Sequence, residues 1–127
     1  MLFEIAAVVT IVDGLKGYLS NNNKEKEKVA AAAGQLNESI TLTRLYLRDK
    51  NVGKFEGIEQ ERADEIALSW TKTASLIGQF NPDLAEVCMK KVLLWSYPDN
   101  QPRQVIVEKG LTLARLQQDL KVLMNMK

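Results

Sequence analysis

Two glutamates four residues apart form the first pair in this sequence whose spacing could support chemistry. Glu61 and Glu65 share one face of a predicted helix, because residues i and i+4 are neighbours on a helix surface. Paired carboxylates can chelate a hard cation, but calcium and magnesium sites use more oxygen ligands, usually from a shaped loop. The sequence has no D-x-D-x-D-G loop. We therefore expect no metal site, and we interpret both acids as a solvated face that pairs with arginines.

The arginines expected to face these acids are Arg44 and Arg48, which are also four residues apart. A guanidinium group binds carboxylates and phosphates in bidentate geometry, so this pair is a candidate anion contact. No Gly-rich loop of the Walker A type accompanies it. The preferred interpretation is therefore a set of surface ion pairs, with anion binding by Arg44 and Arg48 as the alternative.

Cys88 is the single cysteine and the only candidate thiol nucleophile. A reactive cysteine needs an adjacent base and partial exposure. Lys90 and Lys91 are close in sequence but do not share its helix face. We therefore predict a buried structural thiol.

Three aromatic residues could form a stacking surface. Trp70 falls on an apolar helical stripe and is predicted to lie in the core. Trp95 and Tyr97 stand at the end of a predicted helix, next to Pro98. Half-exposed aromatic residues at such a position are candidate interface anchors.

The chain contains no histidine. This absence excludes His-based acid–base catalysis, Ser-His or Cys-His nucleophile activation, and nearly all zinc and haem sites. With no other catalytic motif, we predict that the protein is not an enzyme, has no catalytic residue and uses no cofactor.

Chain length and net charge limit the number of domains and the kinds of partner that we expect. The 127 residues are enough for a single domain spanning residues 1–127. With 17 basic and 16 acidic residues, the chain lacks the strongly basic character of a nucleic-acid-binding protein, so no nucleic-acid partner is expected. One cysteine cannot form an internal disulfide, and nothing indicates export, so we predict a reducing, cytoplasmic location.

Helical periodicity dominates the chain, and no proline occurs before Pro82. We predict an all-α fold, an antiparallel helical bundle of four to five helices. The expected helices cover residues 2–19, 24–50, 57–79, 82–96 and 102–125. Asn51 and Gly53 suit a helix end, and Asn81 followed by Pro82 suits a helix start. Gly110 leaves open whether residues 102–125 form one helix or two.

The first of these helices is apolar around most of its circumference, so we predict that it packs centrally. Asp13 is expected to be exposed, and Ile11 and Leu15 buried. The narrow exposed stripe is formed by small and polar residues: Thr10, Asp13, Lys16, Gly17 and Ser20. The unbroken apolar run, residues 5–12, is eight residues long, whereas a membrane span needs about 20.

The leading hypothesis is a small non-enzymatic helical module that acts through protein–protein interaction or self-association. Its positive support is surplus apolar surface, including Met89, Leu93 and Leu94. The alternative is a membrane-active or signalling bundle that exposes its N-terminal helix. In its apolar helix at residues 2–19 the chain is similar in general character to the HeLo-type bundles of cell-death proteins. That resemblance implies a membrane surface as partner.

Overall fold

The computed structural model describes residues 5–21, 26–54, 60–89 and 103–125. Within these ranges the chain forms helices and no strand, which confirms the all-α prediction. The helices are α1 (Ile5–Asn21), α2 (Lys26–Asn51), α3 (Gln60–Gly78), α4 (Pro82–Val87) and α5 (Arg103–Met124).

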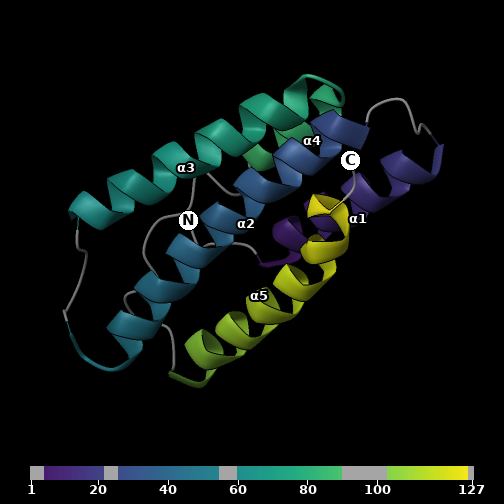
Figure 1. Ribbon diagram of the computed structural model, residues 1–127. Coiled ribbons are helices and arrows are strands. Elements are labelled where there is room, and N and C mark those ends of the chain that lie inside the picture. Colours follow the sequence, from purple (N-terminus) through teal and green to yellow (C-terminus); the bar gives the residue numbers. More distant parts are fainter. Residues whose placement is uncertain (1–4, 22–25, 55–59, 90–102, 126–127) are drawn as a thin grey trace.

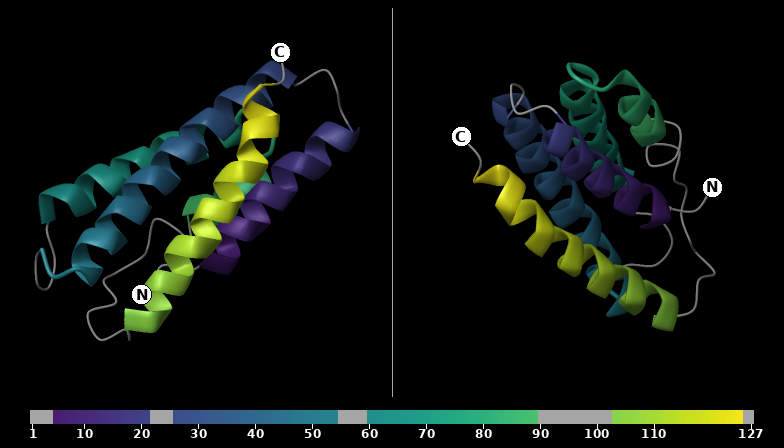
Figure 2. Two further views of the ribbon diagram at one scale, coloured as in Figure 1. Left: turned by 60° about the horizontal axis from the view of Figure 1, so that its bottom comes forward. Right: turned by 90° about the vertical axis from the view of Figure 1, so that its right-hand side faces the viewer.

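Helix α2 packs against three of the four other described helices. It contacts α5, α3 and α1. Helices α3 and α5 lie on opposite sides of α2 (Figure 1), and the described parts of α3 and α5 make no contact with each other. Helix α1 contacts α5, α2 and α4, and Figure 2 shows it beside α5. A functional site on α3 and a functional site on α5 would therefore have different neighbouring helices.

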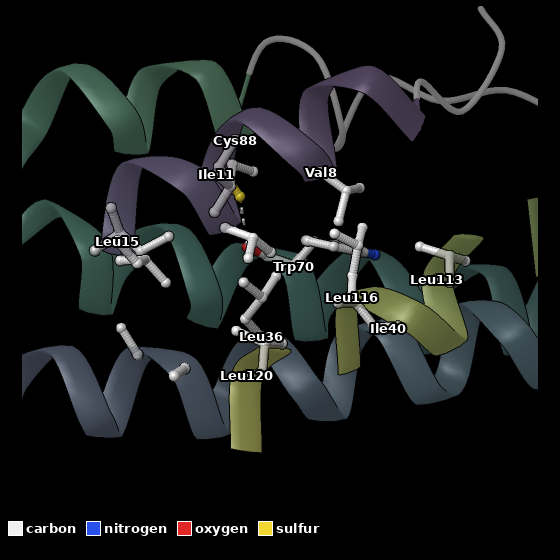
Figure 3. Close-up of a cluster of buried hydrophobic side chains, with 14 of the residues drawn as sticks. Val8, Ile11, Leu15, Leu36, Ile40, Trp70, Cys88, Leu113, Leu116 and Leu120 are labelled. Atoms are coloured by element: carbon white, nitrogen blue, oxygen red, sulfur yellow. Dashed lines mark hydrogen bonds between the residues drawn. The ribbon is translucent and has the colours of Figure 1, made fainter. Parts of the chain in front are cut away.

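The buried side chains follow the helical period that the sequence predicts. In α5, the residues Leu113, Leu116, Leu120 and Leu123 recur every three or four positions, and all four are buried. In α2, Leu36 and Ile40 are fully buried and meet Trp70 of α3 in one cluster (Figure 3). Full burial of a Leu or Ile side chain contributes about 1.5–3 kcal/mol, so these stripes hold the helices together.

Helix α1 presents its apolar side chains to the same cluster. Val8, Ile11, Val12 and Leu15 have no exposed surface, while Asp13 is exposed. The predictions for Ile11, Leu15 and Asp13 are thus confirmed residue by residue. Among the described residues, no helix combines the length and the apolar character needed to cross a membrane.

Helix ends occur where the local sequence predicts them. Helix α2 ends at Asn51, and Gly53 in the following turn has a φ of 78°, a left-handed conformation that glycine adopts without strain. At the start of α4, the Asn81 side chain accepts a hydrogen bond of 3.1 Å from the backbone N–H of Leu84, and Pro82 is the first helical residue.

The structure adds detail to two of the predicted helices. Helix α5 runs without a break through Gly110, so its residues form one helix rather than two. Helix α4 is α-helical to Val87 and continues as a π-helical turn at Cys88 and Met89. The remaining residues of the predicted helix, 90–96, lie outside the described part of the chain.

Candidate functional site

The contact between α2 and α3 contains a row of buried hydroxyl groups. Ser39 Oγ lies 2.7 Å from Ser69 Oγ and 2.9 Å from Thr73 Oγ1, and all three side chains are buried. At the edge of this row Gln35 Nε2 donates a hydrogen bond of 3.2 Å to Ser69 Oγ. A serine nucleophile needs a general base and access for its substrate, and this row offers neither. We assign these hydroxyl groups a structural role.

Trp70 extends the same row into the apolar core. Its indole Nε1 donates a 3.1 Å hydrogen bond to Thr43 Oγ1, and Thr43 Oγ1 donates a 2.8 Å bond to the carbonyl oxygen of Ser39. Trp70 has no exposed surface, which confirms that it is a core residue.

A second polar contact joins α2 to α5 through Gln117. Its side-chain Nε2 donates to Asn37 Oδ1 at 2.9 Å and to Thr41 Oγ1 at 2.7 Å. Its Oε1 accepts a hydrogen bond from Arg44 Nη1. One amide of α5 therefore binds three side chains on successive turns of α2, and Arg44 is one of them.

Arg48 belongs to a different cluster, centred on Asp49 at the end of α2. Arg48 Nε lies 3.1 Å from Asp49 Oδ1, and Arg62 Nη1 of α3 lies 2.8 Å from Asp49 Oδ2. Lys54 Nζ lies 3.5 Å from the same carboxylate. Burial by itself raises the pKa of Asp49. The hydrogen bonds from Arg62 and Arg48 and the positive charges of Lys54 and Arg48 outweigh burial and lower this pKa below its ordinary value.

The predicted ion pairs between the arginines of α2 and the glutamates of α3 are wrong. Arg44 contacts Gln117 and Arg48 contacts Asp49, while Glu61 and Glu65 are exposed and make no ion pair within the described part of the chain. The reason is the orientation of α2, which directs Arg44 towards α5 rather than α3. Arg44 and Arg48 thus sit in separate clusters, and anion binding by this pair stays a prediction.

Cys88 lies against the core side of α3. It has no exposed surface, and its Sγ lies 3.8 Å from the backbone oxygen of Trp70 (Figure 3). Burial raises the pKa of the Cys88 thiol to about 12, so the thiol is protonated at neutral pH. The thiolate is the nucleophilic form, and the structure therefore places Cys88 as a buried packing residue.

Other predicted features concern residues or movements beyond the described part of the chain. Trp95 and Tyr97, the candidate interface anchors, lie outside the described residues, so their role stays a prediction. Across the described ranges, no three acidic or cysteine side chains are grouped closely enough to hold a metal ion. The alternative in which α1 leaves the bundle for a membrane requires Val8, Ile11 and Leu15 to leave the core, and it also stays a prediction.

Among the described residues, an open groove between α3 and α4 with a volume of about 660 Å³ is a candidate binding surface. We call it the α3–α4 groove. The described residues that line it are mostly small or apolar: Thr71, Ala74, Ser75, Pro82, Ala85, Glu86 and Met89. A Cβ added to Gly78 would lie 3.6 Å from the Ala85 Cβ, which is ordinary van der Waals contact between the two helices.

Two large apolar side chains are exposed in the α3–α4 groove or near it on α3. Met89 is 47% exposed and lies in the groove, and Leu68 is 64% exposed on α3, one helical turn before Thr71. Sequence reasoning identified Met89 as surplus apolar surface but did not find the groove. The other lining residues are small, and nothing in their spacing distinguishes them from ordinary helix surface.

Comparison with known proteins adds no further assignment. No family model, curated protein or solved structure matches this chain.

Proposed function

We propose that this protein is a non-enzymatic helical module that acts by binding another polypeptide through the α3–α4 groove. The observation that carries the proposal is the combination of an open apolar groove of about 660 Å³ with the exposed side chains of Met89 and Leu68. Apolar surface gathered in a groove favours binding, because a partner removes that surface from water.

A polypeptide suits this groove better than a small molecule does. Small-molecule sites enclose most of the ligand surface and hold it with a few convergent polar groups. The α3–α4 groove is open to solvent, and its polar lining side chains are Thr71, Ser75 and Glu86. Binding of an apolar helix face in a groove needs no such enclosure, because anchors spaced three or four residues apart enter the groove along its length.

The proposal includes the finer arrangement of the fold, an antiparallel bundle with α1 enclosed by its neighbours. It is supported by the close approach of α1 to α4, where a Cβ on Gly14 would lie 2.8 Å from Leu84 Cδ2. It is also supported by the Tyr18 and Phe80 rings, whose centroids lie 5.0 Å apart. A scaffold packed in this way holds the two walls of the groove in place before a partner arrives, which lowers the entropic cost of binding.

Site-specific photo-crosslinking tests the proposal. A photoreactive amino acid replaces Ser75 inside the groove, and a matched protein carries the same group at Glu38, an exposed position on α2 outside the groove. After irradiation in cells that express the protein, Ser75 should form crosslinks to a polypeptide and Glu38 should not. Mass spectrometry then identifies the captured chain.

A pair of apolar-to-acidic substitutions serves as the control for groove specificity. Met89→Glu places a charge in the groove and should reduce crosslinking from Ser75 about fivefold or more, the loss expected when an interface residue worth about 1 kcal/mol is removed. Val52→Glu makes the same kind of change at a position that is 57% exposed in the turn after α2, and it should have no effect. Equal crosslinking from Ser75 and Glu38, or equal effects of both substitutions, would contradict the proposal.

A further inference from the structure

Helix α5 carries an exposed stripe that none of the described helices covers. Leu111 and Val122 are each 65% exposed, and Arg115 and Gln118 are exposed between them. At about 100° per residue these four positions fall within an arc of about 60° on one face of the helix. Arg115 makes no ion pair with any described residue. The stripe therefore presents one cation between two apolar side chains.

The exposed positions of α3, the helix that forms one wall of the groove, carry more acidic than basic residues: Glu61, Asp64 and Glu65 against Lys72. Residues 60–89 include five acidic and two basic residues, and one of the basic residues, Arg62, is already paired with Asp49. Asp64, Leu68, Thr71 and Ser75 follow one another at intervals of three or four along α3, and all four are exposed. Asp64 therefore lies on the same side of α3 as the groove residue Thr71, and the exposed Leu68 lies between Asp64 and Thr71.

We propose that the polypeptide bound by the α3–α4 groove is helix α5 of a second copy of this chain. This inference rests on the proposed function and names its partner. Val122 of one copy enters the groove beside Thr71 of the other, and Arg115 pairs with Asp64. Arg115 and Val122 are seven residues apart, as are Asp64 and Thr71, so a parallel contact between α5 and α3 brings both pairs together over about 10.5 Å.

The placement of the two surfaces determines the symmetry of the assembly. Helices α3 and α5 lie on opposite sides of α2 (Figure 1), and their described parts do not touch. A chain therefore does not fill its own groove with its own α5. The groove and the stripe are different surfaces, so each contact is heterologous, and their placement on opposite sides of α2 lets further copies add head to tail.

The contact joins one exposed ion pair to a short apolar stripe, so the association is weak and sensitive to salt. Exposed ion pairs contribute little individually, and salt at 1 M reduces the screening length to about 3 Å. Wild-type protein should therefore show an average mass that increases with concentration at low salt and decreases towards the monomer mass at high salt.

Sedimentation equilibrium of the full chain with exchanged charges tests the register directly. Arg115→Glu and Asp64→Arg each place like charges in contact and should weaken self-association about fivefold or more. An equimolar mixture of the two variants restores opposite charges at every contact, and so does the double variant in a single chain. Both should associate as the wild type does. Lys121→Glu on α5 and Asp13→Arg on α1 change exposed charges outside the α5 stripe and outside the exposed row of α3. Both variants should associate as the wild type does.

Three results would overturn the inference: a wild-type protein that stays monomeric at concentrations up to about 1 mM, single variants that associate normally, or a mixture that fails to restore association. The crosslinking experiment separates this failure from failure of the proposed function. If Ser75 captures a different protein while the wild type is monomeric, the groove binds a polypeptide and the second copy is not its partner. If Ser75 captures no polypeptide, both proposals fail.

Discussion

The indole Nε1 of Trp70 donates a 3.1 Å hydrogen bond to the hydroxyl group of Thr43, and this bond joins α3 to α2 inside the apolar core. Neither residue has any exposed surface. The Thr43 hydroxyl in turn donates to the carbonyl oxygen of Ser39, one turn earlier in α2. The relative position of the two helices is therefore specified by paired polar atoms as well as by apolar contact, because an unpaired buried polar group is costly.

Thr43→Val should lower the free energy of unfolding by about 1–3 kcal/mol, because the buried indole N–H of Trp70 loses its acceptor while the shape of the side chain is kept. Thr43→Ser keeps the hydroxyl group and loses only a methyl group, so it should cost less. Urea denaturation of both variants measures the difference. A Val variant as stable as the Ser variant would show that this hydrogen bond does not stabilise the protein.

The hydroxyl row between α2 and α3 should respond non-additively to substitution. Ser39→Ala removes the shared partner of Ser69 and Thr73, leaves their hydroxyl groups with fewer bonds and should cost about 1–2 kcal/mol. Ser39→Ala, Ser69→Ala and Thr73→Val combined remove all three polar groups and should cost less than the sum of the single changes. Additive losses in denaturation experiments would contradict a connected network.

Two glycines of α1 provide a matched pair for the α1–α4 contact. Gly17 has no neighbour within 4 Å of an added Cβ, so Gly17→Ala should raise the free energy of unfolding by about 0.5–1 kcal/mol through helix propensity. At Gly14 the added Cβ would lie 2.8 Å and 2.9 Å from the two methyl carbons of Leu84, a buried side chain that must then move. Gly14→Ala should therefore be less stable than Gly17→Ala by about 1 kcal/mol or more. Equal thermal stability of the two variants would exclude a close α1–α4 approach.

The Asp49 cluster should contribute to stability above the ordinary carboxyl pKa and lose that contribution in acid. The pKa of Asp49 is lowered in the folded protein, so the folded state favours its charged form. That stabilisation is present above the unfolded-state pKa of about 3.9 and is lost as the pH falls through the lower folded pKa.

Asp49→Asn should therefore be less stable than the wild type at neutral pH, and the difference should shrink as the pH falls below about 4. Denaturation curves recorded from pH 7 to pH 2 measure it. Asp13→Asn, at an exposed site without an ion pair among the described residues, is the control for removing one surface carboxylate. A constant difference between wild type and Asp49→Asn across this range would mean that the charge of Asp49 does not stabilise the fold.

The sequence predicted those features that depend on one helix at a time. The inward positions of Ile11, Leu15 and Trp70 follow from the spacing of apolar residues, and the structure confirms each of them. The N-cap at Asn81 is likewise confirmed, since a side chain three residues from its partner needs no tertiary information to form the bond. The continuity of α5 through Gly110 was not predicted, because a mid-helix glycine costs only about 1 kcal/mol and tertiary packing decides whether the helix continues.

The partners of polar residues were not predicted correctly from sequence. Arg44 was expected to meet Glu61 or Glu65 and instead binds Gln117, which is 73 residues away in the chain. Helical period shows which side of α2 carries Arg44, but it does not show which helix lies on that side. The α3–α4 groove was missed for the same reason, since Ala74 and Ala85 form a hollow only when two particular helix faces meet.

The sequence by itself determined that the described part of the chain is helical, that apolar residues such as Ile11, Leu15 and Trp70 enter the core, and that histidine chemistry is absent. These properties follow from residue type and from the 3.6-residue period, which act over a few turns. The tertiary structure alone decided that Ser39 meets Ser69, that Arg62 reaches Asp49, and that α3 and α4 form an open groove. Such contacts depend on the rotation and register of whole helices, and these are set by the packing of all the apolar faces together.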